Sequence, residues 1–412
     1  MSVSATASSS ARPRLKLSPL ERRASMMLAL LFASRMLGLF LLTPVFAVAA
    51  TSLPGGNDAL KVGLALGAYG LAQAVLQIPL GMASDRFGRR PVIMAGMVLF
   101  ILGGVVCALA QSVDGIIVGR VLQGLGAISA AITAWVADAT RPEVRTRAMA
   151  MVGGSIGLSF AASLVLSPVL VGWFGLSGLF WAISLLGFVC LLLATFAVPV
   201  VPAVQQAMSG ARARDVLAHT GLLRLNFGVF CLHAILMAVF MVAPGLLAER
   251  GGYDASSLWQ VYLPVILGSF VFMVPAVFYT ETRRVHPQVL LAAIALLLLV
   301  MLALPFARQG FATLVLALLL FFVAFNILEA LQPSLVSREA PAQYKGLALG
   351  FYNTAQSLGV FAGGALGGLL SARVSVDGVF MLAAGLALLW LLTALGFRPS
   401  FQPVSKATHS GS

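Results

Sequence analysis

Twelve long apolar runs constrain this chain more than any other feature. One helical crossing of a bilayer needs about 20 mainly apolar residues. Runs of that length lie near residues 25–50, 60–83, 91–110, 114–138, 147–171, 176–198, 222–248, 257–280, 287–306, 310–333, 345–371 and 376–397. Apolar residues make up 60% of the 412 residues and charged residues 9%, against roughly 45–50% and about 25% in soluble proteins. The sequence therefore predicts an all-α polytopic membrane protein with twelve transmembrane helices.

The longest polar interval divides the runs into two groups of six. It covers residues 199–221 and carries Pro, Gln, Ser, Gly and Arg, a composition typical of linkers. We therefore expect two six-helix bundles, at 24–198 and 222–397, with this interval as a cytoplasmic linker. The remaining segments, 1–23 and 398–412, are expected to be cytoplasmic tails, the first of them disordered.

The two halves resemble each other at one position. Arg147 opens span 5 and Lys345 opens span 11, each after a short loop that contains proline. Because each half has an even number of spans, the halves would keep one orientation and be related by an axis along the membrane normal. The alternative is that any two helix starts look alike.

The N-terminal run is too long for a cleavable signal peptide. From Ala24 to Ala50 there are 27 residues with one charge, whereas a signal core has about 7–15 apolar residues. We expect this run to be retained as the first span.

Basic residues predict the orientation in the membrane. If Met1 is cytoplasmic, 20 of the 26 Lys and Arg residues fall on the cytoplasmic side, four fall outside, and Arg35 and Arg120 fall within spans. Such an asymmetry indicates that both termini and the linker are cytoplasmic. The net charge of +13 would suggest a nucleic-acid partner in a soluble protein. Here the basic residues lie between apolar runs, so we expect no nucleic-acid partner.

Other chemistry has little support in the sequence. The three cysteines lie inside apolar runs, without pairing or metal-ligand spacing, so neither a disulfide framework nor a metal site is expected. No catalytic dyad, nucleotide-binding loop or filter-like repeat is present, which argues against an enzyme, a channel or direct drive by ATP. The chain is therefore not expected to be an enzyme.

The loop between spans 2 and 3 is the most specific motif. It runs Gly81-Met-Ala-Ser-Asp85-Arg86-Phe-Gly88-Arg89-Arg90-Pro91, and span 4 adds Arg120-Val-Leu-Gln123-Gly124-Leu-Gly126-Ala127. Both segments resemble motifs of the major facilitator superfamily, with Ala83-Ser84 standing where the family pattern has Leu-Ala. The resemblance extends from span 1 to span 12 and favours the drug/proton antiporter branch. The resemblance also implies a location in a bacterial inner membrane. The bacterial type of that branch to which the chain is most similar carries an extra C-terminal cytoplasmic domain, which we do not expect here because only 14 residues follow Arg398.

This resemblance implies a fold and a mode of action. Two six-helix bundles would rock around a central site in alternating access, with a small-molecule substrate, protons and the lipid bilayer as partners. No cofactor is expected beyond the proton as coupling ion, and the chain is expected to act as a monomer. The resemblance further implies that Asp85 caps the start of span 11, and that Arg89 and Asp138 form a charge relay. The simpler alternative is that Asp85 and Arg89 are solvated loop charges that follow the positive-inside rule.

Small residues in spans 5 and 11 predict close helix packing at a gate. The antiporter signature of span 5 appears with its spacing kept but with serine or valine at three glycine positions. The residues concerned are Gly154, Ser163, Ser167, Pro168, Val171 and Gly172 in span 5, and Gly359, Gly363 and Gly367 in span 11. The alternative is composition alone, because glycine is common in membrane helices.

Four ionisable residues inside the spans are candidates for proton coupling. Glu329 in span 10 is the acid placed well inside a span, and a charge there is costly enough to suggest a function. Arg35 in span 1 lies at a comparable depth and is its expected partner. His233 in span 7 is the alternative proton carrier, and Arg120 is a further candidate. The alternatives are a Glu329 that reaches the interface or the backbone, a His233 that is a satisfied donor, and an Arg120 that extends to the outer interface.

Other residues on spans 1, 4, 7 and 10 are candidates for the substrate cavity. Arg120 and Asp138 are 18 residues apart, five helical turns or about 27 Å, so a continuous helix would put them at opposite ends of one stripe of small and polar residues. The candidates for the cavity lining are Phe32, Met36, Phe40, Gln123, Phe240, Met241 and Asn326.

Two functions therefore stay open. The leading hypothesis is a secondary active transporter, a proton-coupled antiporter that exports drugs or other small amphipathic molecules. The alternative is a proton-coupled symporter that imports a small nutrient such as a sugar or organic acid. A mostly apolar lining with one acid would favour the first, and several hydrogen-bonding groups the second.

Overall fold

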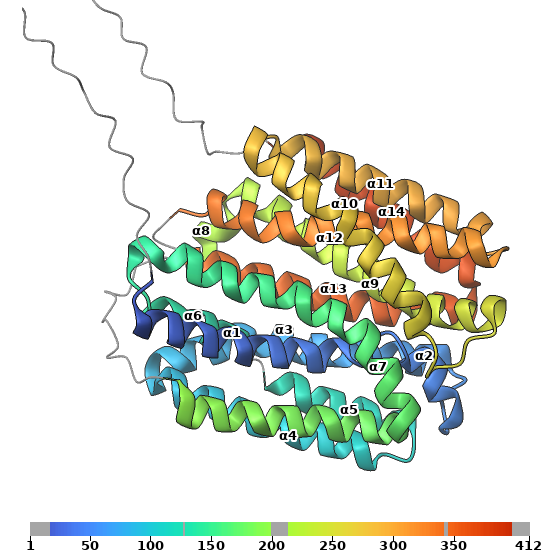
Figure 1. Ribbon diagram of the computed structural model, residues 1–412, viewed down its shortest axis with the longest axis horizontal. Helices are drawn as coiled ribbons and strands as arrows, with labels where there is room; N and C mark the ends of the chain where they lie inside the picture. Colours follow the sequence, from blue (N-terminus) through green and yellow to red (C-terminus); the bar gives the residue numbers. More distant parts are fainter. Residues whose placement is uncertain (1–16, 127, 199–212, 342–344, 398–412) are drawn as a thin grey trace, which may run out of the picture.

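A computed structural model describes residues 17–126, 128–198, 213–341 and 345–397, and every regular element in these ranges is a helix (Figure 1). The N-terminal half contains α1 (Pro19–Phe40), α2 (Phe46–Ala49), η1 (Ala50–Ser52), α3 (Ala59–Phe87), α4 (Arg89–Leu109), α5 (Val113–Leu125), α6 (Ser129–Asp138), α7 (Pro142–Leu192) and η2 (Leu193–Ala197). The C-terminal half contains α8 (Ala213–Leu217), α9 (Thr220–Gly251), α10 (Trp259–Arg283), α11 (His286–Ala307), α12 (Phe311–Glu339), α13 (Lys345–Arg373) and α14 (Val376–Leu395).

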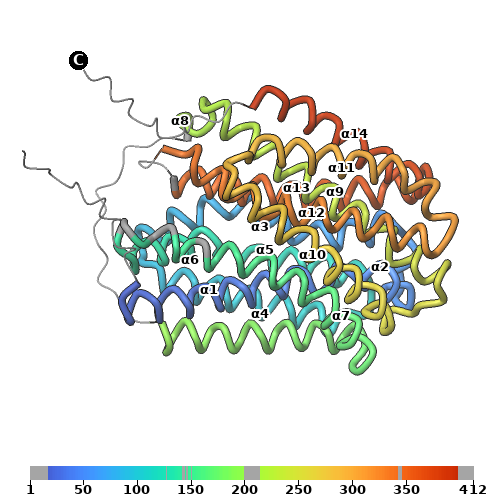
Figure 2. Tube along the Cα trace, turned by 45° about the horizontal axis from the view of Figure 1, so that its top comes forward, coloured from blue at the N-terminus to red at the C-terminus, as the bar shows by residue number. Residues whose placement is uncertain are grey.

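With α5 and α6 taken together as one segment, eleven of the described helical segments are long and apolar enough to cross a membrane. One of them, α7, is 51 residues long and turns at Gly175, whose φ of 68° lies in the left-handed region that favours glycine. The chain reverses there, and the second arm runs back along α4 (Figure 2). Counting the two arms separately gives the twelve predicted spans and confirms the predicted fold class.

The first helix begins earlier than predicted. Ser18 accepts a hydrogen bond from the backbone of Glu21, and the Glu21 carboxylate accepts one from the backbone of Ser18, which forms a capping box. Glu21 also pairs with Arg141, 2.9 Å away in the α6–α7 loop. The expectation of a disordered tail through residue 23 is therefore wrong for residues 19–23, which form the first turn of α1, while residues 1–16 lie outside the described range.

Span 4 is interrupted, which corrects the prediction of one continuous stripe. α5 ends at Leu125, Gly126 and Ile128 have non-helical backbone angles, and α6 starts at Ser129. The interruption lies where span 4 contacts α4. The contact is close, since a Cβ on Gly126 would overlap the carbonyl oxygen of Gly96. Arg120 and Asp138 therefore belong to two separate helices, α5 and α6.

The two bundles repeat the same neighbour relations. In the N-terminal bundle α3 packs on α5, α4 on α5 and on the second arm of α7, and α1 on α7; in the C-terminal bundle α10 packs on α12, α11 on α12 and α14, and α9 on α13. Corresponding spans are thus neighbours in both halves, as a parallel repeat requires. Of the predicted linker, residues 199–212 lie outside the described range, and α8 and the start of α9 occupy much of the rest.

The bundles meet most closely along α3 and α13. A Cβ on Gly63 would overlap the carbonyl oxygen of Gly364, and a Cβ on Gly368 would overlap that of Ala59. Glycine at these positions lets the two backbones touch, which is how helices associate in lipid without help from the hydrophobic effect.

We call the end of the molecule that carries the motif from Gly81 to Pro91 the motif end, which is on the left in Figure 1. The opposite end carries the connections from α1 to α3 and from α9 to α10, and we call it the loop end. At the loop end the bundles are in contact. Tyr262 of α10 donates a hydrogen bond of 3.3 Å to the carbonyl of Pro44, and α2 packs on α9. The molecule is therefore closed at the loop end.

Candidate functional site

The motif loop is organised around the guanidinium of Arg89, at the first position of α4. Its Nε donates to Asp138 Oδ2 at 2.8 Å, at the end of α6, and its Nη1 pairs with Asp85 at the end of α3. Gly88 has a φ of 93°, so the chain turns between α3 and α4 in a conformation suited to glycine. One arginine thus links the ends of three helices, while its role in a charge relay stays a prediction.

Ser84, one of the two departures from the family pattern, contributes to this arrangement. It is buried, and its hydroxyl accepts a hydrogen bond of 2.8 Å from Arg89 Nη1 while donating to the carbonyl of Gly81 at 2.7 Å. Sequence reasoning noted the departure but not its role.

The other motif residues have simpler surroundings. Gly81 faces Ala130 of α6, where a Cβ would be 3.2 Å away. Arg86 is exposed and lies over the ring of Phe87, and Arg90 is half-buried. The capping of span 11 by Asp85 stays a prediction, because residues 342–344 and the Lys345 side chain lie outside the described part of the chain.

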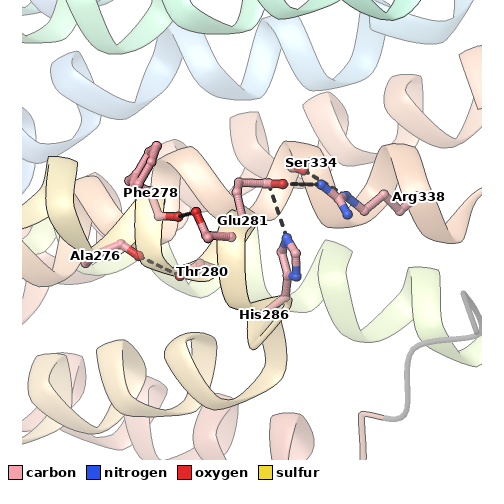
Figure 3. Close-up of polar contacts among 8 residues, drawn as sticks. Ala276, Phe278, Thr280, Glu281, His286, Ser334 and Arg338 are labelled. Atoms are coloured by element: carbon pink, nitrogen blue, oxygen red, sulfur yellow. Dashed lines mark hydrogen bonds and ion pairs between the residues drawn. The ribbon is translucent and has the colours of Figure 1, made fainter. Parts of the chain in front are cut away.

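The C-terminal bundle carries a matching cluster in which an arginine, Arg338, stands where the N-terminal bundle has Asp138 (Figure 3). Glu281 at the end of α10 accepts two hydrogen bonds from Arg338 of α12, at 2.6 and 2.9 Å, and lies 3.2 Å from His286 Nε2 of α11. These positions correspond to those of Asp85, Asp138 and Arg89, so an acid now links the three helix ends. Sequence reasoning missed this cluster because its residues fall in three separate segments.

The predicted gate residues of spans 5 and 11 mostly contact helices of their own bundles. Gly359 and Gly363 of α13 pack against the backbone of α9 at Phe230 and Ala234, and Gly367 lies close to Ala238, so this stripe faces its own bundle. In α7, buried Ser163 donates to the carbonyl of Phe160, while Ser167 donates to that of Leu41 and so fastens α7 to α1. Pro168 lies inside α7, one residue after Ser167.

The two glycines of the span 5 signature differ in how closely they are packed. Gly172 meets Ser256 of the α9–α10 loop, across the bundle boundary at the loop end. A Cβ on Gly154 would meet no atom within 4 Å. The expectation of close packing is therefore wrong for Gly154 in this conformation.

A cluster of aromatic rings fills the space between the bundles. Phe160 of α7 lies with its ring centroid 5.1 Å from Phe40, 6.3 Å from Phe240, 6.0 Å from Phe322 and 5.3 Å from Phe325. All five side chains are buried. Phe160 and Phe40 come from the N-terminal bundle and the others from the C-terminal bundle, so we call these five rings the central aromatic cluster.

Sequence reasoning named Phe40 and Phe240 but not Phe160, since span 5 was considered only for its small residues. Among the other cavity candidates, Met36 lines the small cavity described below, whereas Phe32 is a core residue of α1. Met241 packs near Gly367, and Asn326 donates to Ser269 of α10 at 2.9 Å. These two residues are thus engaged with their own bundle.

Glu329 lies beside His233. Its Oε2 is 3.7 Å from His233 Nε2 and, among the described residues, has no hydrogen-bond partner. His233 Nδ1 lies 3.1 Å from the carbonyl oxygen of Val229, and Nε2 lies 2.7 Å from the amide nitrogen of Gln356. Since a carbonyl only accepts, Nδ1 carries the proton and Nε2 has the lone pair.

Arg35 is engaged elsewhere, so the predicted pair with Glu329 is not formed in this conformation. Its Nη1 donates to Ser129 at 2.6 Å and its Nη2 to Gln73 at 2.7 Å, both in the N-terminal bundle. Arg120 donates to Gln123 at 3.2 Å and is fully buried, which contradicts an extension to the outer interface. Both arginines lie by the ring of Tyr69.

A small cavity lies between the polar residues around Arg35 in the N-terminal bundle and those around His233 in the C-terminal bundle. It offers about 10 Å³ to the centre of a water molecule, about the space that one water occupies. Met36, Tyr69 and Gln73 line it from the N-terminal bundle, and His233 and Gln356 line it from the other. The polar groups of the two bundles therefore face a common space.

The chain matches the family described as Major Facilitator Superfamily over residues 28–364 and 285–411. The chain belongs to this superfamily. It is 44% identical to the inner membrane transport protein YajR of Escherichia coli K12, over 92% of this chain and 84% of that protein. It is 28% identical to the multidrug resistance protein MdtH of Aeromonas salmonicida, over 83% and 86% of the two chains. The superfamily resemblance drawn from the two motifs is thereby confirmed.

Solved structures agree on the fold. The human organic anion transporter MFSD10 superposes with a TM-score of 0.67 at 22% identity, covering 92% of this chain and 100% of that one. A D-xylose–proton symporter superposes with a TM-score of 0.69 at 17% identity, covering 91% and 97%. The superfamily match and the 44% identity to YajR, together with the membrane-spanning helices, make this chain a multi-pass secondary active transporter.

Proposed function

We propose that this chain is a proton-coupled antiporter of the inner membrane that exports small amphipathic molecules, with Glu329 and His233 as its proton site. The observation that carries the proposal is the Glu329 carboxylate, which lies at membrane depth 3.7 Å from His233 Nε2 with no hydrogen-bond partner among the described residues. Ionisable side chains in transmembrane segments are costly and usually mark a proton or substrate path.

The pair has room for one exchangeable proton. The lone pair of Nε2 accepts from the Gln356 amide, and the carboxylate lies 3.7 Å from the same nitrogen, so an unprotonated pair keeps two electron-rich groups close together. A proton on the carboxylate removes its charge, and a proton on Nε2, which displaces the Gln356 amide, forms an ion pair with it. Tyr352 of α13, whose hydroxyl is buried without a partner in the described part of the chain, is a further titratable group close to Glu329.

The surroundings of the pair support an amphipathic substrate. His233 lies 6.0 Å from Phe325 by ring centroids, so the proton site adjoins the central aromatic cluster. A centre made of rings binds apolar and aromatic groups better than sugars, which need several hydrogen-bonding groups. The relative named a multidrug resistance protein, at 28% identity, favours the same choice over nutrient import.

In an alternating-access cycle, the two ends of the molecule open in turn to the two sides of the membrane. We assign the motif end to the cytoplasm because most basic residues gather there. With the loop end closed, the described conformation then corresponds to an inward-facing or occluded step, and protonation of the Glu329–His233 pair biases the exchange between states.

The test is substrate movement against an imposed proton gradient. In inside-out vesicles with an acidic interior, an antiporter accumulates substrate in exchange for protons, whereas a symporter does not. Glu329→Gln should abolish this gradient-driven accumulation and leave downhill exchange partly intact. Glu249→Gln, at an exposed position of the loop end, is the matched control and should behave as the unmodified chain. Full gradient-driven transport by Glu329→Gln would refute the assignment.

A further inference from the structure

Two arginines are buried in the middle of the N-terminal bundle around one tyrosine. Arg35 of α1 and Arg120 of α5 are 1% and 0% exposed. Their guanidinium carbons lie 5.6 Å and 4.8 Å from the centre of the Tyr69 ring on α3. Two permanent positive charges thus share one site at membrane depth, where even a single charge is costly.

Among the residues that the structure describes, no acid pairs with these charges. Within the described ranges, neither arginine forms an ion pair with a carboxylate: the partners of Arg35 are Ser129 and Gln73, and the partner of Arg120 is Gln123. The acid placed at membrane depth, Glu329, is beside His233 in the other bundle.

Several donors of the site are still available. A guanidinium has five N–H donors, and Arg35 Nε, Arg120 Nε and Arg120 Nη2 are buried without a protein partner in the described part of the chain. The Tyr69 hydroxyl and the amide nitrogen of Gln123 are in the same condition. The site therefore combines positive charge with unused hydrogen-bond donors, which is the composition that an anion requires.

The site also has an approach from the substrate region. Tyr69 and Gln73 line the small cavity between the bundles, and Gln73 is the acceptor of Arg35. The opposite wall is His233, which adjoins Phe325 of the central aromatic cluster. A ligand with its apolar part among these rings would thus have its polar end directed towards Tyr69 and the two arginines.

We propose that Arg35, Arg120 and Tyr69 form a subsite for the carboxylate of the transported molecule, so that the substrates are amphipathic organic anions. This inference rests on the proposed function for the position of the apolar part and narrows its substrate class. A carboxylate accepts paired hydrogen bonds from a guanidinium and neutralises a charge that is otherwise uncompensated. In this conformation the subsite is occluded, so entry requires the bundles to separate at one end.

Binding to the purified, full-length chain tests the subsite without any gradient. The probes are 4-phenylbutyrate, 4-phenylbutyramide and 4-phenylbutylamine, which share size and ring but are anionic, neutral and cationic. Sodium chloride and inorganic phosphate are the additional arms. We expect phenylbutyrate to bind about tenfold or more tightly than the amide, because charge-assisted hydrogen bonds are lost with the charge, and the amine to bind no better than the amide.

Variants locate the preference. Arg120→Gln and Arg35→Gln should each remove the preference for phenylbutyrate over the amide, while Arg120→Lys keeps part of it. Arg373→Gln, exposed at the loop end, is the matched control and should leave the ranking unchanged. The ranking of probes on the unmodified chain does not depend on how well the variants fold.

Several results would overturn the proposal. They are equal binding of phenylbutyrate and its amide, a preference for the amine, or an anion preference that survives in both Gln variants. Chloride or phosphate binding as tightly as phenylbutyrate would overturn the assignment to an organic carboxylate. Proton-driven transport confined to neutral and cationic molecules would refute this inference and leave the proposed function standing. Anion binding without proton-driven transport would support the carboxylate subsite and refute the proposed function of a proton-coupled antiporter.

Discussion

Phe160 of α7 lies with its ring centroid 5.3 Å from that of Phe325 of α12, so one ring of the N-terminal bundle packs directly on a ring of the C-terminal bundle. The contact sits at the centre of the molecule, next to His233 and the cavity between the bundles. We therefore expect any movement of one bundle against the other to change this ring contact.

Removing the Phe160 ring should therefore change both stability and selectivity. Phe160→Ala leaves a cavity among the four neighbouring rings and should destabilise the protein by about 3–5 kcal/mol. It should also shift transport towards bulkier substrates. Thermal unfolding in detergent and a transport panel of graded substrate size measure both effects. Phe306→Ala, at a side chain 79% exposed on α11, is the control. An unchanged size preference would remove Phe160 from the substrate region.

Close approach of the α3 and α13 backbones should be sensitive to a single methyl group. Gly364→Ala places a Cβ against the carbonyl of Gly63, and overpacking of this kind costs about 1–3 kcal/mol. The variant should have a lower unfolding temperature and a larger fraction open at the loop end. Gly385→Ala, where a Cβ meets nothing within 4 Å, should be neutral or slightly stabilising. Equal effects of both changes would contradict the described contact.

The Arg89 network should depend on Ser84. Ser84→Ala, which restores the residue of the family pattern, removes the hydrogen bond of 2.8 Å to Arg89 and should cost about 1 kcal/mol. Asp138→Asn should do more, since it removes the charge of the partner at 2.8 Å. Turnover and unfolding temperature are measured for the single and double variants. The effects of the two substitutions should be non-additive, because both changes act on one guanidinium. Fully additive effects would contradict a shared network.

The Glu281 cluster should matter for transport as the counterpart of the motif loop. Glu281→Gln weakens the links to Arg338 and His286 and should lower turnover several-fold with a small change in stability, since exposed ion pairs contribute about 0–1 kcal/mol. The Glu249→Gln variant again serves as the exposed control. Turnover equal to that of the unmodified chain would reduce the cluster to a surface ion pair.

Membrane orientation is open to direct labelling. With the natural cysteines replaced, single cysteines at Ser4, Ser209 and Ser410 should resist an impermeant thiol reagent in intact cells. A cysteine at Ser52, exposed at the loop end, should react. The reverse pattern would invert the assignment of the motif end to the cytoplasm.

The sequence alone determined the class of this protein, because the bilayer imposes a length on every crossing and the loop motifs have fixed spacing. Twelve apolar runs and the polar interval between them were sufficient to predict the two bundles, and the motifs at Gly81 to Pro91 and Arg120 to Ala127 were sufficient to predict the family. The same runs did not predict where helices break, since the interruption after Leu125 lies at a contact between Gly126 and a distant glycine, Gly96.

Only the tertiary structure decided which buried groups are partners. Glu329 and Arg35 have comparable depths along their helices, and depth was all that sequence spacing provided. Rotation of each helix about its axis, which depends on packing against its neighbours, directs Glu329 towards His233 and Arg35 towards Gln73 and Ser129. The same packing brings Phe160 into the centre and leaves two arginines around Tyr69 without an acid. Contacts between distant segments determine these relations, and no local pattern in the sequence encodes them.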